Sequence, residues 1–471
     1  MKTYTQKINY MKSETDHNQI KTKHSFSRRN FLKFGVAGVA GLILLERSYD
    51  YLSESTVKAK IVIVGGGAAG ITMSAYLSDM LRHVDITIIE PGDTHYYQPG
   101  FTLIAADVFT PEEVTRTTKE LLPNQVKWIK DSVTELNPDN NSLTTGQNGK
   151  IAYDFLVLVP GCQMDFNLVE GISREHLGEG NVHSIYDFKG AALCRDAIKQ
   201  LEVKKEGRLL FTNTYTKIKC GGAPKKICLL TEDYLAKRDL RKNFEITYFA
   251  NQNELMKPKV YGDRLIEIFK ERQIPVKYKH RLASVDTSAK KAVFDLLPEP
   301  SANPVPAEAN NQKLVVDYDF LHIVPPMSAP DFVKNSIVSV PIDEKNQGGW
   351  VKVDKETLIH SKFKNIISLG DVAGIPTSKT GAAIRMQAPI AAANLISLME
   401  GNEPELKYNG YSACPIVTEY GKVLMCEFGY NDKLMPTIPF IDPAVERGIW
   451  WTLKVHGLKP MYYNGMLKGL I

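Results

Sequence analysis

The sequence predicts an α/β chain with two dinucleotide-binding (Rossmann-like) domains followed by a C-terminal membrane-associating region. Three observations carry this prediction. A strand, a glycine-rich turn, a helix and a second strand ending in an acid follow one another over residues 60–90. A later apolar strand ends in Gly370-Asp371 and precedes a helix of small residues. The last 30 residues combine tryptophan and tyrosine with lysine, which is typical of a membrane interface.

The length of 471 residues predicts two or three domains rather than one compact core. Hydrophobic residues make up 43% and charged residues 24% of the chain, which excludes a wholly disordered chain and a multi-pass membrane protein. The net charge of +5 is too small to argue for nucleic acid as a partner. Six cysteines without a CxxC pair exclude a disulfide-stapled miniprotein, and the ten histidines show no metal-binding pattern, so no metal is expected.

Residues 1–57 are expected to form a targeting signal and linker. Ser27-Arg28-Arg29-Asn30-Phe31-Leu32-Lys33 places two arginines before a short apolar run, Phe34 to Leu45. A helix that spans a bilayer needs about 20 residues, so this run is too short to do so. The pattern resembles a twin-arginine export signal, which predicts a protein on the periplasmic face of the cytoplasmic membrane, either peripheral or anchored by its signal. The alternative is a helix start with chance basic residues.

The glycine-rich turn Gly65-Gly66-Gly67-Ala68-Ala69-Gly70 follows the first apolar strand, and the second strand ends at Glu90. Gly65 allows the tight turn, Gly67 lets a pyrophosphate approach the backbone, and Gly70 lets the helix pack closely on the strand. The helix N-terminus offers free N–H groups to the phosphates, and Glu90 can accept hydrogen bonds from ribose hydroxyls. The complete unit therefore predicts a dinucleotide site, and Glu90 argues against NADP.

The distal chain favours FAD as the dinucleotide. The strand ending in Gly370-Asp371 is typical of flavoproteins with two dinucleotide domains, in which it returns to the first domain and its acid binds the ribityl hydroxyls. The next helix, Gly381 to Met399, then points its N-terminus at the flavin. Related flavocytochrome flavoproteins bind FAD covalently through a cysteine after the first acidic strand. The resembling segment here, His95 to Phe101, has no cysteine, so FAD is expected to be non-covalent. The predicted FAD contacts are Gly65, Gly67, Ala69, Gly70, Glu90, Gln98, Val133, Gly370, Asp371 and Lys379.

The middle of the chain predicts a second dinucleotide-like domain that lacks the nicotinamide fingerprint. The strand Arg208 to Asn213 is followed by Thr214 to Lys226, where glycine is absent from the positions that a pyrophosphate turn requires. A helix to Leu235 and the strand Phe244 to Phe249 follow as expected. The architecture is thus retained without a nicotinamide site; the alternative is a divergent loop that still binds NADH.

A cysteine replaces the nicotinamide turn in this loop. Cys220 is flanked by Lys217, Lys219, Lys225 and Lys226 near the start of a helix. Nearby cations and a helix N-terminus both lower the pKa of a thiol, so Cys220 is expected to be a functional thiolate. The other cysteines are expected to be structural: Cys162, Cys194, Cys228 and Cys426.

Several segments resemble the sulfide:quinone oxidoreductases, most closely their mitochondrial-type branch, over about residues 58–471. The most specific segments are Ile218 to Lys226, Val324 to Pro330, Gly370-Asp371 with Pro376 to Thr380, and Tyr408 to Pro415. The resemblance implies a fold of the FAD-dependent disulfide oxidoreductase type, one FAD, a pair of redox cysteines and a membrane quinone. Carried over by motif, the redox pair is Cys220 and Cys414.

The implied reaction starts from a Cys220–Cys414 bridge, with or without additional sulfur. Hydrosulfide attacks one sulfur and leaves a persulfide, and two electrons pass through FAD to quinone while the sulfane sulfur leaves on an acceptor. Lys379 and a nearby helix N-terminus would stabilise the anionic reduced flavin. The sequence leaves open the acceptor, the quinone and the cysteine that carries the persulfide.

The C-terminal tail predicts contact with a membrane surface and its quinone. The aromatic residues expected there are Trp450, Trp451, Tyr462 and Tyr463. Tryptophan and tyrosine favour the headgroup region, and the neighbouring lysines can pair with anionic lipid. The alternative is a C-terminal helix pair packed on the body of the protein.

The chain is predicted to divide into 1–57, the signal; 58–165, the first part of the FAD domain; 166–320, the second dinucleotide-like domain; 321–400, the returning part of the FAD domain; and 401–471, which carries Cys414 and the membrane tail. Pro298 to Asn311 is expected to be a surface loop. The leading hypothesis is a sulfide:quinone oxidoreductase whose partners are sulfide, quinone, a sulfane-sulfur acceptor and the membrane; a homo-oligomer is left open. The alternatives are a type II NADH:quinone dehydrogenase and an exported flavoprotein subunit for electron transfer.

Overall fold

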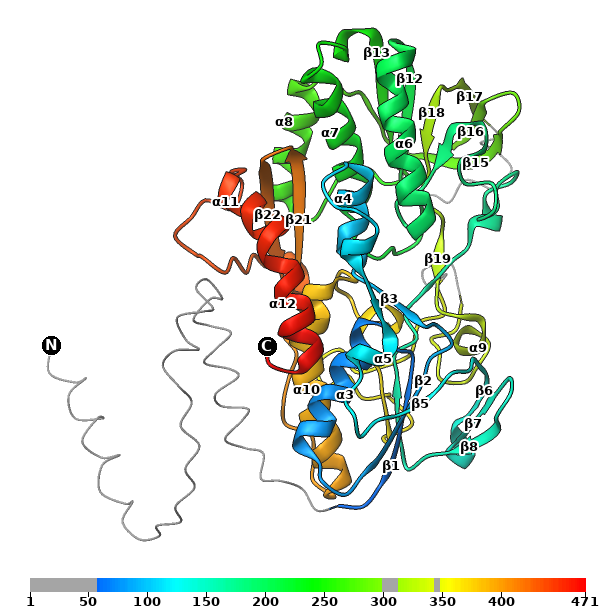
Figure 1. Cartoon of the computed structure of the whole chain (residues 1–471), viewed down its shortest axis with the longest axis vertical. Helices are drawn as coiled ribbons and strands as arrows, with labels where there is room; N and C mark the ends of the chain where they lie inside the picture. The colour runs from blue at the N-terminus through cyan, green and yellow to red at the C-terminus, as the bar shows by residue number, and fades with distance from the viewer. Residues whose placement is uncertain (1–56, 299–311, 343–347) are drawn as a thin grey trace, which may run out of the picture. The chain divides into compact units, whose positions relative to one another are not determined.

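The computed structural model describes residues 57–298, 312–342 and 348–471 (Figure 1). The predicted signal, Ser27 to Leu45, lies outside the described residues. The same is true of the predicted surface loop beyond Pro298.

The first sheet has five parallel strands in the order β20, β9, β1, β2, β5. Their bounds are β1 (Lys60–Val64), β2 (Asp85–Ile89), β5 (Lys127–Ile129), β9 (Phe155–Leu158) and β20 (Ile366–Ile367). Ile366 of β20 lies opposite Leu156 of β9. The chain therefore returns to its first sheet at the predicted strand, which confirms that part of the fold prediction.

Both faces of this sheet are covered, which explains the continuous apolar run of β1. Ile61 and Ile63 face a core shared with α3 (Ala68–Met80) and α10 (Gly381–Met399), whereas Val62 and Val64 face a second core on the other side. A strand buried on both faces has no need for polar residues at alternate positions. The sheet thus fixes the glycine-rich turn and the end of β20 at the same edge.

Among the described residues, α10 is the one helix long and apolar enough to cross a membrane by length and composition. More than half of its apolar stretch is buried within the fold, and it packs along α3. Its small side chains, Ala388, Ala391 and Ala392, belong to the core beneath the first sheet. These contacts give α10 the role of a core helix.

The second sheet also has five parallel strands, in the order β11, β18, β12, β13, β14. Their bounds are β11 (Val182–His183), β12 (Gly207–Thr212), β13 (Phe244–Phe249), β14 (Val276–Lys277) and β18 (Phe320–His322). The helices that accompany it are α6 (Phe188–Lys204), α7 (Ala223–Ala236) and α8 (Lys259–Glu271). An antiparallel sheet follows, made of β15 (His280–Asp286), β16 (Lys291–Leu296) and β17 (Lys313–Asp317).

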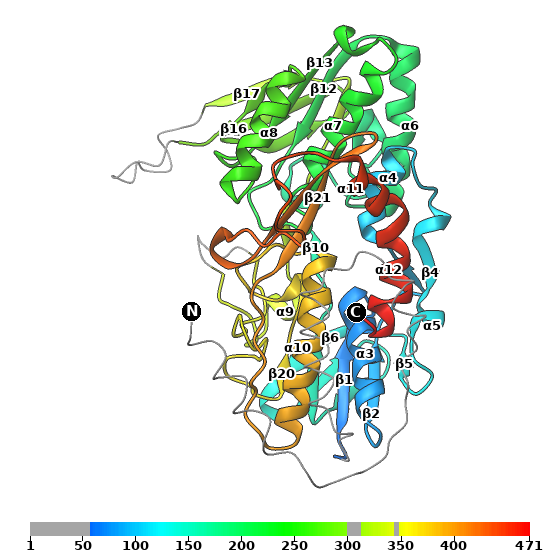
Figure 2. The ribbon, with the colours of Figure 1, turned by 90° about the vertical axis from the view of Figure 1, so that its left-hand side faces the viewer.

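The C-terminal part begins with the antiparallel hairpin β21 (Ser412–Glu419) and β22 (Lys422–Phe428). It continues through α11 (Gly448–Thr452), the π-helical turn η11 (Leu453–Gly457), α12 (Leu458–Asn464) and η12 (Met466–Lys468) (Figure 2). The hairpin packs against α7, whereas η12 packs on α3. The tail therefore bridges the two sheets.

The other strands and α-helices of the described residues belong to smaller sheets or to connections. They are β3 (Thr94–Tyr96), α4 (Phe101–Ala105), β4 (Thr115–Thr117), α5 (Thr118–Leu121), β6 (Val133–Asn137), β7 (Ser142–Thr145), β8 (Gly149–Ala152), β10 (Gln163–Met164), β19 (Met327–Ser328) and α9 (Asp331–Lys334).

Candidate functional site

The glycine-rich turn after β1 has the backbone geometry that a dinucleotide requires. Gly65 has φ +104°, and a Cβ there would lie 2.5 Å from the carbonyl oxygen of Val159. A Cβ on Gly70 would lie 1.8 Å from the carbonyl oxygen of Gly65, so only glycine lets α3 approach this closely. A Cβ on Gly67 would meet nothing within 4 Å, which leaves the N-terminal end of α3 open to a ligand.

The acid at the end of β2 faces this turn. The Glu90 carboxylate accepts hydrogen bonds from the backbone N–H of Gly66 at 2.6 Å and of Gly92 at 2.7 Å. The Nδ1 atom of His95 lies 3.3 Å from the carbonyl oxygen of Gly66. Burial lowers the pKa of His95 to about 4, so this imidazole is neutral at physiological pH.

The strand β20 brings a second acid to the same edge of the sheet. Gly370 has φ +71° and donates its N–H to Gln387 at 2.9 Å. Within the described chain, the Asp371 carboxylate has no hydrogen-bond donor, and burial raises its pKa against the opposing charges of Lys219 and Lys379. Asp371 is only partly buried, and its carboxylate has free acceptor positions, so this acid fits a ligand that supplies hydroxyl groups.

Lys379 is held close to Asp371 by main-chain acceptors. Its Nζ donates to the carbonyl oxygens of Asp371 at 2.6 Å and Ala373 at 3.1 Å, and it lies 3.8 Å from the centre of the Trp350 ring. Burial lowers the pKa of Lys379 to about 8. A small recess beside it is lined by Gly370, Ile375, Thr377, Ser378, Lys379, Thr380, Ala383 and Gln387.

Three other predicted FAD contacts occupy different surroundings. Ala69 lies beside Gly370, because a Cβ on that glycine would be 3.3 Å from the methyl group of Ala69. Gln98 is exposed at the start of a short helical turn. Val133 is buried in the core under Ile89 and Leu143. The structure brings Ala69 to the site, whereas contacts of Gln98 and Val133 with FAD stay predictions.

The two cysteines predicted as a redox pair meet in the structure. Cys220 and Cys414 are 194 residues apart in sequence, and their Sγ atoms are 3.9 Å apart. Cys220 has φ +50°, an uncommon conformation for a residue with a side chain. Its N–H donates to the Lys379 carbonyl oxygen at 2.8 Å, and its carbonyl oxygen accepts from the Tyr186 hydroxyl at 3.2 Å. These bonds hold Cys220 opposite Cys414.

A buried cation contacts the first sulfur of the pair. The Lys226 Nζ lies 3.3 Å from the Cys220 Sγ, and Lys226 is only 3% exposed. A hydrogen bond from the Cys414 thiol, followed by the charges of Lys226 and Lys454, holds the pKa of Cys220 well below its usual range despite burial. The pKa of Cys414 is raised by the same hydrogen bond and by burial. The surrounding charges therefore favour the thiolate form of Cys220 over that of Cys414.

Comparison with known proteins identifies the family to which this site belongs. Residues 59–200 match the family model described as pyridine nucleotide-disulphide oxidoreductase. A relative from Mus musculus named mitochondrial sulfide:quinone oxidoreductase is 36% identical over 87% of this chain and 86% of its own length. One from Dictyostelium discoideum with the same name is 37% identical, over 87% of this chain and 86% of its own length. The chain belongs to the sulfide:quinone oxidoreductase family.

A solved structure of a sulfide:quinone oxidoreductase, from Aquifex aeolicus, has the same fold. It superposes with a TM-score of 0.68 over 86% of this chain and 91% of its own length, at 21% identity. This likeness confirms the predicted α/β fold with Rossmann-like domains.

The prediction of a periplasmic location reached through a twin-arginine signal is wrong. The matched relatives from Mus musculus and Dictyostelium discoideum are both named as mitochondrial proteins, which points away from export to a periplasm. A pair of arginines before a short apolar run is a weak pattern, because it consists of common residue types over few positions.

Lys454 is the member of this sulfide:quinone oxidoreductase site that sequence reasoning missed. It lies in the π-helical turn η11, is 2% exposed, and donates to the Pro99 carbonyl oxygen at 3.3 Å. Burial and the charge of Lys226 lower the pKa of Lys454 to about 7, although the two cysteines oppose this shift. In the sequence it looks like an interface lysine, and π-helical turns, which are frequent at functional sites, carry no sequence signature.

The aromatic residues predicted for the membrane surface are mostly inside the protein. Trp450 is 9% exposed, and Tyr462 and Tyr463 are each 7% exposed, while Trp451 is partly buried. Tyr462 donates to or accepts from the His95 Nε2 at 2.6 Å, and the Tyr463 hydroxyl donates to the Val114 carbonyl oxygen at 3.0 Å. For Trp450, Tyr462 and Tyr463 the structure agrees with the alternative, a C-terminal helix pair packed on the body of the protein. Their role in a quinone site stays a prediction.

Gly222, at the start of α7, permits the close approach of the two cysteine-bearing elements. A Cβ on Gly222 would lie 2.1 Å from the Cδ1 atom of Ile416 and 2.6 Å from the Sγ atom of Cys414. The Gly222→Ala variant should therefore displace β21 and slow sulfide-dependent quinone reduction by about 10- to 100-fold, because small misplacements of reacting groups are that costly. Steady-state kinetics at saturating quinone measures the effect.

The neighbouring variant Gly221→Ala is the matched control, because a Cβ there would meet nothing within 4 Å. It should keep the activity of the unchanged protein within about twofold. Equal losses in the two variants would show that the tight contact with Cys414 does not matter.

Proposed function

We propose that this chain oxidises sulfide at Cys220 and Cys414 and passes two electrons through non-covalent FAD to a membrane quinone. One observation carries the proposal: the two sulfur atoms lie 3.9 Å apart beside a buried lysine, although they belong to different parts of the chain. Reduction of a soluble quinone analogue by the purified chain, dependent on added sulfide, tests it. A flavoprotein that serves only as an electron-transfer subunit would show no such activity.

The residues around the first sheet fit FAD. Gly67 and the open N-terminus of α3 would hold the pyrophosphate, and Glu90 would hold the adjacent ribose. Asp371, which lacks a donor among the described residues, would accept from the ribityl hydroxyls. FAD when bound supplies a two-electron acceptor between the cysteines and quinone. The segment His95 to Phe101 offers no cysteine for a covalent bond.

The charge around the pair favours one direction of attack. Hydrosulfide attacks the Cys414 sulfur of the Cys220–Cys414 disulfide, a new sulfur–sulfur bond forms on Cys414, and the old one breaks. The electron pair of the broken bond goes to Cys220, which becomes a thiolate, and Cys414 becomes a persulfide. Lys226, 3.3 Å from the Cys220 sulfur, stabilises that thiolate, and Lys454 adds a second positive charge. Cys220 is therefore the better leaving group.

The second half of the cycle removes the outer sulfur. An acceptor nucleophile takes the sulfane sulfur and leaves Cys414 as a thiolate. The two thiolates would then re-form the disulfide by giving their two electrons to FAD, which supplies the two-electron acceptor when bound. Lys226 contacts the Cys220 sulfur and its pKa is raised, so its positive charge favours an anionic acceptor such as sulfite or a thiolate over a neutral one. Measuring the sulfur products formed with anionic and with neutral acceptors tests this preference.

The membrane surface of the tail is formed by exposed aliphatic and aromatic side chains other than the predicted rings. Phe440 is 88% exposed and Ile449 is 59% exposed. Phe440 lies between Ile438 and Ile441, which pack on the same core cluster as Trp450. An apolar surface of this kind suits the interface of a bilayer, where the substrate quinone is dissolved.

The double variant Phe440→Ser/Ile449→Ser should bind lipid vesicles about tenfold more weakly, because two large apolar side chains lose their burial in lipid. Flotation of the full chain with vesicles of mitochondrial lipid composition measures the affinity. Val203→Ser, on an exposed position of α6, should leave binding unchanged. Unchanged binding of the double variant would move the membrane surface elsewhere.

The alternative of a type II NADH:quinone dehydrogenase is disfavoured by the loop after β12. The Gln252 side chain donates to the Thr214 carbonyl oxygen at 2.8 Å and accepts from Asn213 at 2.8 Å. Thr216 accepts from the backbone N–H of Met327 at 2.8 Å. Protein groups thus pair the polar atoms of the loop at the position where a pyrophosphate turn would lie. The loop also lacks glycine at the positions that a pyrophosphate turn requires, which argues against NADH binding there.

A further inference from the structure

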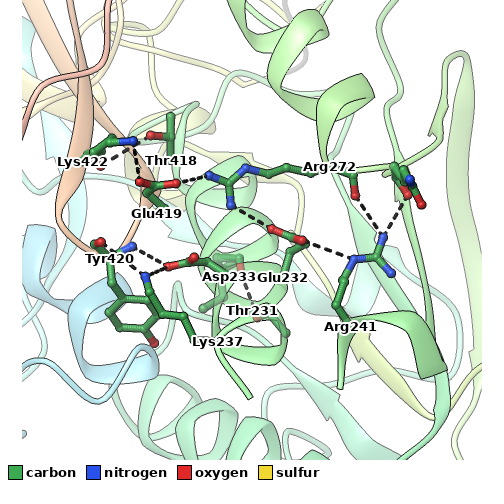
Figure 3. Close-up of polar contacts among 12 residues, drawn as sticks. Thr231, Glu232, Asp233, Lys237, Arg241, Arg272, Thr418, Glu419, Tyr420 and Lys422 are labelled. Atoms are coloured by element: carbon green, nitrogen blue, oxygen red, sulfur yellow. Dashed lines mark hydrogen bonds and ion pairs between the residues drawn. The ribbon is translucent and has the colours of Figure 1, made fainter. Parts of the chain in front are cut away.

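A group of charged side chains joins α7 to the β21–β22 hairpin (Figure 3). Arg272, which follows α8, donates from Nη1 to Glu232 of α7 at 2.8 Å. The same guanidinium donates from Nη2 to Glu419, the last residue of β21, at 2.7 Å. We refer to Glu232, Arg272 and Glu419 as the arginine clamp.

Adjacent contacts strengthen the same connection. Asp233, the next residue of α7, accepts the backbone N–H of Tyr420 at the hairpin turn at 2.8 Å and pairs with Lys237 (Figure 3). Arg241 lies 3.3 Å from the Glu232 carboxylate and donates to the carbonyl oxygen of Arg272 at 3.1 Å. Two consecutive acids of α7 are thus tied to the end of one strand.

The clamp lies at the far end of the two elements that carry the redox pair. α7 begins three residues after Cys220 and carries Glu232 near its last turn, while β21 has Cys414 near its start and Glu419 at its end. The helix rises about 14 Å from its first residue to Glu232. The strand extends about 17 Å from Cys414 to Glu419. The two segments are therefore similar in length and are joined at both ends.

The contact between α7 and β21 is apolar along its middle and charged at the clamp. Between the ends, α7 and β21 meet through apolar side chains such as Leu230 and Val417, which attract without a fixed direction. The side chain of Arg272 is 16% exposed and that of Glu232 is 6% exposed, so the ion pairs are largely shielded from water. Buried ion pairs contribute little to the stability of the fold compared with apolar packing. Their best-attested role is to select one register between the elements that they join.

We propose that Arg272 is a positioning residue that fixes α7 in register with β21 and thereby holds the Cys220 and Cys414 thiols within bonding reach. Without the clamp, the apolar contact permits small sliding or rotation of α7, which moves Cys220 away from Cys414. The use of this disulfide in sulfide oxidation rests on the proposed function, whereas the effect of Arg272 on disulfide formation does not.

The test measures the thiol–disulfide equilibrium of the FAD-loaded full chain in glutathione buffers. Two cysteine thiols and one oxidised glutathione give one protein disulfide and two reduced glutathiones, so atoms and electrons balance. Alkylation of free thiols and mass spectrometry give the fraction of the Cys220–Cys414 disulfide. The Arg272→Gln variant should lower the equilibrium constant for disulfide formation about tenfold, which corresponds to about 30 mV for this two-electron couple.

Arg264→Gln is the matched control, because Arg264 lies on α8, which Arg272 directly follows, and forms ion pairs with Glu267, Glu271 and Glu446 instead. It should keep the equilibrium constant of the unchanged protein. Should Arg272→Gln fail to fold, Glu419→Gln decides, since it removes the β21 side of the clamp and leaves the Arg272–Glu232 pair in place. Arg272→Lys should restore part of the loss.

An unchanged equilibrium constant in both Arg272→Gln and Glu419→Gln overturns the inference, and so does an equal shift in Arg264→Gln. Sulfide-dependent quinone reduction is measured separately on the same preparations. A shift in Arg272→Gln without sulfide oxidation by any preparation keeps the inference and rejects the proposed function. The absence of a Cys220–Cys414 disulfide in the unchanged protein in every buffer rejects both.

Discussion

Replacing Cys220 or Cys414 by alanine is expected to lower the rate of sulfide-dependent quinone reduction about a thousandfold or more. Either change removes the disulfide that hydrosulfide attacks, because the two Sγ atoms, 3.9 Å apart, can form it only together. The two losses should not add, since the residues act as one unit. Steady-state turnover of both single variants and of the double variant measures this.

Cys228→Ala is the matched control for this prediction. Cys228 lies on α7, the helix that follows the Cys220 loop, and is fully buried. Burial raises the pKa of its thiol well above the usual range, so Cys228 is unreactive. Its replacement should leave turnover within about threefold of the unchanged protein. Retention of full sulfide oxidation by either Cys220→Ala or Cys414→Ala contradicts the disulfide mechanism.

Replacing Lys226 by glutamine is expected to move the acidic limb of the rate profile to higher pH by about 1 to 2 units. The Lys226 ammonium lies 3.3 Å from the Cys220 sulfur and helps to hold the pKa of that thiol below its usual range. Without this charge the thiol pKa rises, so the active thiolate appears only at higher pH. At neutral pH the rate should fall about 10- to 100-fold.

The neighbouring lysine provides the control for the Lys226 variant. Lys225 is equally buried, but its Nζ donates to the Gly221 carbonyl oxygen at 2.9 Å instead of to a sulfur. The Lys225→Gln variant should shift the profile less, and Lys226→Arg should restore most of the rate because it keeps the charge. If the acidic limb of the Lys226→Gln variant does not move, the Lys226 charge does not set the pKa of Cys220. Absorbance of the thiolate near 240 nm, followed against pH, gives an independent measure of the Cys220 pKa.

The parts of the fold that the sequence predicts correctly depend on local patterns. The unit from Lys60 to Glu90 is recognised by its glycines. The structure leaves no room for a Cβ at Gly65 or Gly70, because backbone oxygens lie too close. The apolar run of β1 predicts a buried strand, and the structure adds that the first sheet lies between two cores. The pairing of Cys220 with Cys414 came from resemblance of short motifs, since no local rule connects positions 194 residues apart.

The parts that the sequence does not predict depend on tertiary packing. The charge of Lys454 acts on the redox pair because a π-helical turn and the surrounding core direct this side chain inward. Tyr462 and Tyr463 are buried because the tail packs on the first sheet domain, where His95 and Val114 offer hydrogen-bond partners. Composition alone describes all three residues as interfacial, because aromatic and cationic side chains serve both at a membrane and in a packed tail.

Rapid mixing of the purified, FAD-loaded chain with sulfide or with NADH, followed at about 450 nm where oxidised flavins absorb, tests the central claim most directly. Sulfide should bleach the flavin within one turnover, because the cysteine pair passes its electrons on without quinone present. NADH should not bleach it on that time scale, because the loop after β12 lacks glycine at the positions that a pyrophosphate turn requires. Bleaching by NADH and not by sulfide would contradict the account.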